Sequence, residues 1–359
     1  MSLPKEAIER IQCYNSVSIV LLRIICCVFL ACFCCLAQEF KINPSGFFEA
    51  DGMWRGATTG DTISTKFGAI PLRATEDEWL GSMAHSRAMV KGTVDFGEFK
   101  LVGYGESDFL VKQGIAPFRW RQYWGQIEVG RWRLLGGQTW SLLRPNRKGI
   151  LPDTELMNTH VPEPNYHVGL AGLRKKQLRL IRDFDNGYVA AVEYESQGRV
   201  LAKVAKDSKW GHAEVATTVG REGHRGASLG GVVKLGSRVN WVSQALWSRG
   251  AGPDMLGLIP DLVHAHSTVQ GAEVRVTKHS EIFGYCGIVY GGRSLSNRVV
   301  REWTVGTVSK LYSDPRSGTL SFTTQYSQMD RAPWLGGHGS MNQMILSMRF
   351  FVQRWADQK

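Results

Sequence analysis

Five arginines between positions 119 and 179 are the residues best suited to chemistry in this chain. A guanidinium group keeps its charge at ordinary pH and binds a carboxylate or phosphate through two parallel hydrogen bonds. Groups of this kind select anions where they line a wet passage. We therefore predict a basic wall formed by Arg119, Arg121, Arg133, Arg174 and Arg179.

A long segment from Arg144 to Asn165 follows the first of these arginines and carries charges of both signs. A loop of this length can fold into a barrel and narrow it, with acidic side chains facing a basic wall. We predict that this segment is a constriction loop. Its candidate charged residues are Arg144, Arg147 and Lys148 at the start, with Asp153, Glu155 and Glu163 on the opposing acidic side.

No convergent set of catalytic or metal-binding residues is visible. His264 and His266 form an i, i+2 pair, which we interpret as part of a solvated loop because no third ligand is suitably spaced. Gly220, Gly223 and Gly226 resemble a phosphate loop but do not open a helix. We expect no enzyme activity, no metal and no cofactor. An outer-membrane barrel hydrolase with a serine–histidine site assembled in space stays open as a less favoured alternative.

A predicted hairpin at residues 118–142 positions the first arginines. Two runs of β-type residues are separated by little more than Gly130. Arg119 and Arg121 share one parity, and Trp120 and Trp124 share the other. Because side chains alternate across a strand, one face is cationic and the other aromatic. A membrane barrel turns such an aromatic face to lipid, whereas a soluble sheet buries it.

The second half of this hairpin predicts two aromatic girdles. Trp132 and Trp140 have the same parity and lie eight residues apart, on the order of 20 Å along the membrane normal for a tilted strand. Gln138 has that parity too, which is unfavourable in the middle of a membrane. A bulge near Gly136 and Gly137, or a lumenal position for Trp140, would resolve the conflict.

Alternation of apolar and polar residues recurs along the rest of the chain and predicts an all-β fold. With the long turns and the very short ones, it favours a transmembrane antiparallel β-barrel of about sixteen strands, with short periplasmic turns and long outer loops. The predicted strands are 46–55, 86–96, 99–109, 118–129, 131–142, 167–182 (one long strand or a bent pair), 187–195, 213–221, 229–235, 239–247, 272–277, 282–290, 302–312, 319–328 and 341–355, with a short one at 62–73.

Composition excludes a helical membrane protein, because only 43% of the 359 residues are hydrophobic. The 40 Gly and 12 Trp suit a barrel, but they equally suit a secreted β-sandwich that binds polysaccharide through Trp residues. The net charge of +11 is compatible with nucleic acid, anionic lipid or an anionic solute. Arginines that recur with one strand parity favour a surface lined for small anionic solutes, and we expect no nucleic-acid partner.

The N-terminal segment reads as a signal peptide. Residues 16–37 are apolar except for Arg23, and Cys35 and Ala37 supply small residues at the −3 and −1 positions. We predict cleavage before Gln38, which leaves 38–359 as a single barrel domain. An uncleaved anchor and a lipoprotein site at Cys32 are the alternatives. Six of the seven cysteines precede residue 38, so the remainder has no internal disulfide.

Two motifs resemble a known family. The run from Gly137 to Ser141 (GQTWS), preceded by RWRQY at 119–123, is similar to adjacent strands of the DcaP-like porins of Gram-negative outer membranes. The run RKKQLR at 174–179 looks like the next family element, and the resemblance covers roughly residues 46–182. It implies a sixteen-stranded, homotrimeric channel in the outer membrane for passive diffusion of small anions such as dicarboxylates. The chain departs from the pattern by ending at Lys359 rather than on an aromatic residue.

Overall fold

The computed structural model describes residues 39–352, except 61–62, 111–117, 155, 158–159, 163, 258–262 and 295. The predicted signal peptide and the tail at 355–359 lie outside the described residues. Within the described chain, no helix is long and apolar enough to cross a membrane.

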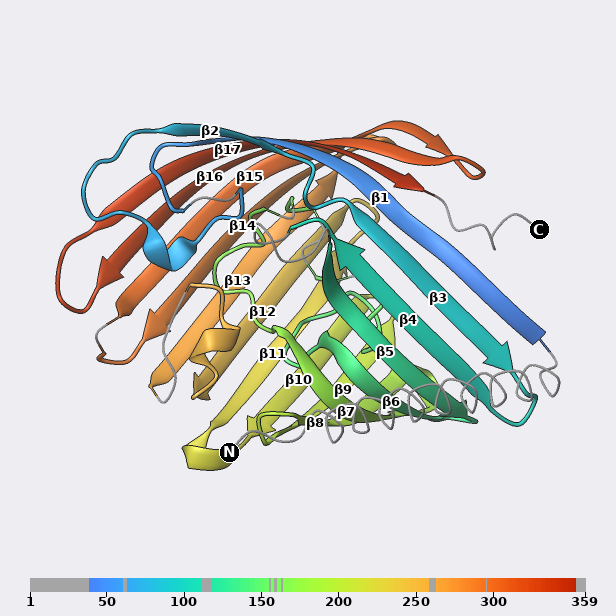
Figure 1. The fold of residues 1–359 in the computed structure, drawn as a ribbon. Coiled ribbons are helices and arrows are strands. Elements are labelled where there is room, and N and C mark those ends of the chain that lie inside the picture. The colour runs from blue at the N-terminus through green and yellow to red at the C-terminus, as the bar shows by residue number, and fades with distance from the viewer. Residues whose placement is uncertain are drawn as a thin grey trace, which may run out of the picture.

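One antiparallel sheet closes on itself as a barrel (Figure 1). Closure occurs between the first and last strands, where Gly46 to Arg55 pair with Val352 to Gln343. The strands are β1 Glu39–Arg55, β2 Glu78–Ser82, β3 Arg87–Asp95, β4 Lys100–Asp108, β5 Arg119–Val129, β6 Trp132–Trp140, β7 Arg174–Asp183, β8 Tyr188–Glu195, β9 Arg199–Ser208, β10 Gly211–Val219, β11 Arg225–Leu235, β12 Val239–Arg249, β13 His264–Arg275, β14 Ser280–Gly291, β15 Asn297–Asp314, β16 Gly318–Pro333 and β17 Gly339–Val352.

The barrel has sixteen strand positions, as predicted, because β2 and β3 share one of them. β2 pairs with residues 51–55 of β1, and β3 pairs with residues 39–47 of the same strand. A single closed sheet has no second layer, so the β-sandwich alternative is wrong. The long connections after β6 and β12 lie at one end of the barrel, and short turns such as those between β5 and β6 and between β9 and β10 lie at the other end.

The strand predictions failed at several places. β2 was not predicted, and β13 begins at His264 rather than at 272. β9 was not predicted, because its inward side chains Arg199, Leu201 and Lys203 mix charged and apolar types and hide the alternation. Residues 62–73 contain no strand among those described; they include a 3₁₀ turn, η1 (Phe67–Ala69). β7 begins only at Arg174, so the predicted start at 167 was too early.

A β-bulge at Arg121 changes the faces predicted for β5. Gln122 pairs with Glu106 and Trp120 pairs with Ser107, so Arg121 is the extra residue. Trp120 is exposed on the outer wall as predicted, but Trp124 points inward. Its indole is 5% exposed and stacks on the ring of Tyr104 at 5.2 Å. The prediction that Trp124 faces lipid was therefore wrong.

The bulge also explains Gln138. Gln138 pairs with Tyr123 in the last β5–β6 pair. Its side-chain amide donates a hydrogen bond to the Arg121 carbonyl oxygen at 3.1 Å, and Arg121 lies just beyond that pair. Trp132 is 44% exposed, whereas Trp140 is 8% exposed and lines the lumen. The two tryptophans therefore do not form two girdles on one face, and lumenal placement of Trp140 is the alternative that holds.

Candidate functional site

The long connection between β6 and β7 folds into the barrel and packs against one side of the wall. Leu142, Leu143, Ile150 and Val168 from this connection share a buried apolar cluster with inward residues of β7 to β9 such as Leu201. The predicted constriction loop thus lies inside the barrel, and it fills the side of the lumen lined by these strands (Figure 1).

Carboxylates of the wall accept hydrogen bonds from backbone N–H groups of this loop. Glu193 accepts from Leu142 at 3.2 Å, and Glu302 accepts from Val168 at 2.8 Å. Loops seldom lie inside proteins, because their backbone groups need partners that water would otherwise supply. The inward carboxylates supply those partners here. Two further pairs are Asn146 with Glu214 and Gly149 with Asp207.

Two inward cations satisfy loop carbonyl oxygens in the same way. Arg179 donates to the carbonyl of Ile150 at 3.1 Å, and Lys203 donates to that of Arg144 at 2.8 Å. Each cation also pairs with a buried wall carboxylate, Glu193 in the case of Arg179. Buried charges of both signs are therefore neutralised where the loop meets the wall.

The loop leaves open a cavity of about 860 Å³, which is also lined by parts of β1, β3 and β13 to β17. Eight Lys and Arg side chains line it, against three Asp and Glu. The cations are Arg87, Lys91, Arg144, Arg147, Arg275, Lys278, Lys310 and Arg349, and the acids are Glu106, Asp153 and Glu281. A passage with this excess of positive charge attracts anions.

Arg119 and Arg121 lie together on β5 and share a carboxylate. Asp108 pairs with Arg119 at 2.6 Å and with Arg121 at 2.7 Å. Arg121 is 2% exposed and also pairs with Glu106 and donates to the Tyr166 hydroxyl at 2.8 Å. Its guanidinium therefore holds the loop through Tyr166 and is not among the cavity lining.

The other three predicted wall arginines have different surroundings. Arg179 is 2% exposed and holds the loop as described above, so it offers no open guanidinium to the lumen. Arg133 pairs with Asp183 near the short-turn end. Arg174 lies over the ring of Trp140, 5.0 Å from its centroid. None of the three lines the cavity.

Three of the residues predicted for the constriction loop do line the cavity. Arg144 and Arg147 both line the cavity, and Asp153 faces it while pairing with Lys91 at 2.7 Å. Lys148 is exposed and is not part of the lining. Glu155 and Glu163 lie outside the described residues.

Two aromatic rings hold Arg144 in place at the cavity. Its guanidinium lies 4.8 Å from the Trp140 ring centroid and 5.5 Å from that of Tyr166. Tyr166 and the following His167 have positive φ values of 32° and 115°, a conformation that costs free energy in non-glycine residues. The contacts of the Tyr166 hydroxyl with Arg121 and Arg87 help to maintain it.

Sequence reasoning missed most of the cations that line the cavity. Lys278 and Lys310 are exposed and form no ion pair with any described residue, whereas Arg349 pairs with Glu49 at 2.7 Å. The signal was present for Arg87 and Lys91, which alternate with the apolar, outward-facing residues of β3.

His160 ties the far end of the loop to β13 and β14. Its ring nitrogens lie 2.8 Å from a Glu281 oxygen and 3.3 Å from a Glu273 oxygen, and Arg147 also pairs with Glu273. Burial lowers the pKa of His160, but the hydrogen bonds to the two carboxylates outweigh burial and raise this pKa to about 9. The imidazole is therefore charged at neutral pH.

One trio of side chains has the contact order of a serine hydrolase. Ser64 Oγ lies 3.4 Å from His85 Nε2, and His85 Nδ1 lies 3.3 Å from Asp51 Oδ2. Both distances exceed the roughly 2.6–3.2 Å expected of a nucleophile and its base. None of the three lines the lumen cavity.

No group of three or more potential metal ligands occurs in the part of the chain that the structure describes. His264 and His266 belong to β13 and are exposed, so their assignment to a loop was wrong.

Several solved porins and outer-membrane channels have this fold. The channel DcaP of Acinetobacter baumannii aligns with a TM-score of 0.71 and 14% identity, over 87% of this chain and 97% of that chain. An anion-selective porin from Comamonas acidovorans gives 0.61 and 12%, over 87% and 100%. OmpF of Salmonella typhi, solved with daunomycin, gives 0.56 and 11%, over 88% and 98%. Neither a protein-family model nor a curated protein matches the sequence.

The chain therefore has the porin fold, and the resemblance predicted from its motifs is confirmed at the level of the fold.

Proposed function

We propose that the protein is an outer-membrane porin through which small anions diffuse passively. The observation that carries this proposal is the lining of the lumen, with eight cations against three acids. A fixed excess of positive charge in a narrow wet passage raises the local concentration of anions and lowers that of cations.

Small dicarboxylates are the proposed solutes. Cations lie on several sides of the cavity: Arg87 on β3, Arg144 on the loop, and Lys310 on β15. A solute with a carboxylate at each end can contact two of these groups at once, whereas a monocarboxylate contacts one. Arg residues suit this role because their planar fork matches a carboxylate.

Planar-bilayer recording tests the anion preference. We expect a reversal potential that favours chloride over potassium in a salt gradient, and a smaller preference in the variant Lys278→Gln/Lys310→Gln. Lys209→Gln/Arg238→Gln is the matched control, because both residues are exposed cations outside the cavity lining. A reversal potential that favours cations in the parent protein would contradict the proposal.

Competition separates dicarboxylates from other anions. Succinate at millimolar concentration should reduce the chloride current more than butyrate does, while the neutral succinamide should have no effect. Equal reduction by succinate and butyrate would leave a general anion channel and remove the dicarboxylate preference.

We propose that the protein is located in the outer membrane and is exported by the predicted signal peptide. Cleavage before Gln38 would release the chain to the periplasm for assembly into the outer membrane. Mass spectrometry of protein purified from outer membranes should give an N-terminus at Gln38. A retained residue 1 would support the uncleaved anchor instead.

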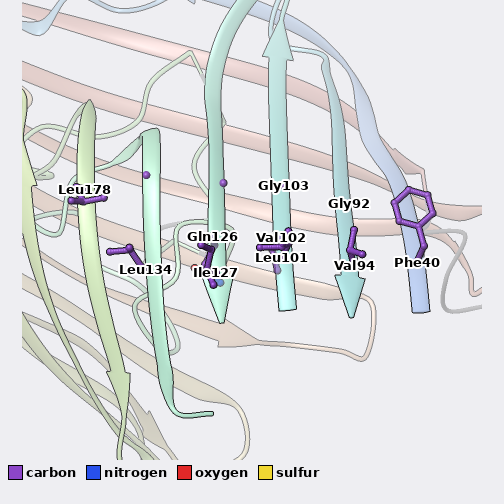
Figure 2. Close-up of a pocket in the computed structure, with 12 residues that line it drawn as sticks. Phe40, Gly92, Val94, Leu101, Val102, Gly103, Gln126, Ile127, Leu134 and Leu178 are labelled. Atoms are coloured by element: carbon purple, nitrogen blue, oxygen red, sulfur yellow. The ribbon is translucent and has the colours of Figure 1, made fainter. Parts of the chain in front are cut away.

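We further propose that the barrel forms a homotrimer through one wall. Four glycines, Gly92, Gly103, Gly125 and Gly136, lie directly opposite one another on β3, β4, β5 and β6. An apolar row that includes Val94, Leu101, Ile127 and Leu134 lies on one side of them. Figure 2 shows the resulting groove on this wall.

The glycines are not required by the barrel itself. A Cβ added to Gly92 or Gly103 would meet no atom within 4 Å. Small residues on a membrane wall allow close approach of another backbone. The outward residues of β3 and β4 also include no aromatic side chain, whereas β12 has Trp241 and Trp247 where lipid contact is expected.

A ridge beside the groove suggests how copies fit together. Phe40, Ile42 and Phe48 on β1 are 56–60% exposed, and Ile42 lies directly opposite Gly92. With sixteen strands, each takes about 22° of the circumference, so the ridge and the groove centre are about 56° apart. In a threefold ring the directions from one copy to its two neighbours differ by about 60°. The ridge of each copy can therefore enter the groove of the next copy at all three interfaces.

Gly103→Leu tests this interface without disturbing the monomer. We expect the parent protein to migrate as a trimer before heating and the variant as a folded, heat-modifiable monomer. Ala245→Leu, on the exposed outer face of β12, is the control and should stay trimeric. A trimeric Gly103→Leu variant would contradict the interface, and channel recording on the same sample tests the pore separately.

A further inference from the structure

Cations are aligned at the long-loop end of three neighbouring strands. Arg225 begins β11 and lies directly opposite Arg249, which ends β12. Arg249 in turn lies opposite His264, which begins β13. Two arginines and a histidine thus occupy one row across three strands.

The row faces outward, away from the lumen. Gly226 and Ser228, which follow Arg225 at inward positions, are buried, whereas Arg225, Ala227 and Leu229 are exposed. On β12 the same alternation makes Ser248 fully buried and Trp247 exposed. These cations therefore do not belong to the pore.

No described residue neutralises this row. Arg225, Arg249 and His264 form no ion pair within the described chain, and like charges directly opposite on neighbouring strands repel. The adjoining turn η3 (Arg221–Gly223) adds one more Arg and one acid, Glu222. By contrast, Arg182 at the other end of the barrel lies over the rings of Trp132 and Phe184.

The side chains below the row follow the layers of a membrane surface. The next outward row contains Ala227, Trp247, His266 and Tyr290, directly opposite one another. Below it lie Leu229 and Ala245 with other mainly apolar residues. Aromatic residues occupy the boundary between headgroups and hydrocarbon. The cations therefore stand at the level of the headgroups.

We propose that this row binds the phosphate of an anionic lipid in the outward-facing leaflet. Side chains directly opposite on neighbouring strands have Cβ atoms about 5 Å apart, which lets two guanidinium groups approach one phosphate. The guanidinium of Arg249 reaches toward the turn, 3.9 Å from where a Cβ on Gly223 would lie. The turn that contains Gly223, between β10 and β11, is short, so a lipid headgroup can reach the row from that side. The inference rests on the barrel's placement in a membrane and does not depend on pore selectivity.

Native mass spectrometry with defined lipids tests the site. The probes are diphosphorylated lipid A, its monophosphorylated form, and phosphatidylcholine, each added to the full-length protein in a neutral detergent. We expect binding in that order of strength. The variant Arg225→Gln/Arg249→Gln should lose at least about tenfold in affinity for diphosphorylated lipid A, since each lost charged contact is worth about a factor of ten.

The same hairpin offers a matched control. Lys234 and Arg238 are exposed cations at the other end of β11 and β12, so Lys234→Gln/Arg238→Gln removes the same charge from the same hairpin. This control should keep parental affinity. Equal losses in the two variants would mean attraction by net charge alone and would overturn the site.

Two further outcomes would also overturn it: parental affinity in Arg225→Gln/Arg249→Gln, or inorganic phosphate competing fully with lipid A at equal concentration, which would identify a free-anion site. Heat-modifiable migration of every variant verifies that the barrel is folded.

Discussion

His160 Nε2 on the lumenal loop lies 2.8 Å from a carboxylate oxygen of Glu281 on β14. The contact fixes the part of the loop around His160 to the wall. It is stronger when the imidazole of His160 is charged. A Glu273 oxygen lies 3.3 Å from the other ring nitrogen, so the charged imidazole has two acidic partners.

The first prediction concerns the pH dependence of stability. The pKa of His160 is about 9 in the folded protein, above the ordinary value of 6.5. The stabilisation is therefore complete below about pH 6.5 and is lost as the pH rises through 9. His160→Asn should be less stable than the parent by up to about 3 kcal/mol at pH 6, with the difference vanishing above pH 10. Urea unfolding at several pH values measures this, and a difference independent of pH would contradict it.

The second prediction concerns the buried pair of Arg179 and Glu193. Arg179→Met leaves the Glu193 carboxylate buried without its counter-charge, at a cost of about 3–5 kcal/mol. The double variant Arg179→Met/Glu193→Met should recover much of that loss. Arg131→Gln is the control, because Arg131 pairs with Asp185 in solvent and should cost less than about 1 kcal/mol.

Single-channel recording gives a second measure for the same variants. If Arg179 holds the loop through the carbonyl of Ile150, its loss should make the current noisier, whereas Arg131→Gln should leave the current unchanged. A quiet Arg179→Met channel with parental conductance would mean that other contacts hold the loop alone.

The third prediction concerns Gly137 beside the bulge on β5. Its φ is 140°, and an added Cβ would lie 2.3 Å from the Tyr123 carbonyl oxygen. Gly137→Ala should therefore destabilise the barrel by about 3 kcal/mol or more. Gly284→Ala on β14 is the control, since the nearest atom to its Cβ, the Thr304 carbonyl oxygen, would lie at 3.6 Å. Urea unfolding compares the two, and equal effects would show that the strand can shift to accept a side chain.

The fold was largely predictable from sequence, and the reason is the outer wall. Lipid requires apolar side chains at every second position, so strands such as β3 and β4 show clear alternation. Where inward residues are also apolar, as at Leu201 on β9, the alternation weakens and the strand is missed. The bulge at Arg121 was equally hidden, because an extra residue leaves no mark in composition.

The site was less predictable than the fold. Parity placed Arg121 and Arg179 on the inner face, but it does not distinguish a side chain that faces the passage from one covered by the loop. That difference depends on which wall the loop packs against. Arg87 and Lys91 were accessible to the same parity argument, and the alternation on β3 was the available signal.

The hydrogen bonds and ion pairs between the loop and the charged wall residues restrict how this barrel can be altered. Removing the loop to obtain a wider pore would strip Glu193, Glu214 and Glu302 of their amide partners and leave Lys203 without its carbonyl. The widened lumen would then expose a new set of acidic groups on β8, β10 and β15. An engineered large-bore version therefore requires redesign of those strands together with the deletion, because the deletion uncovers wall groups of both charges, Arg179 and Lys203 as well as the acids.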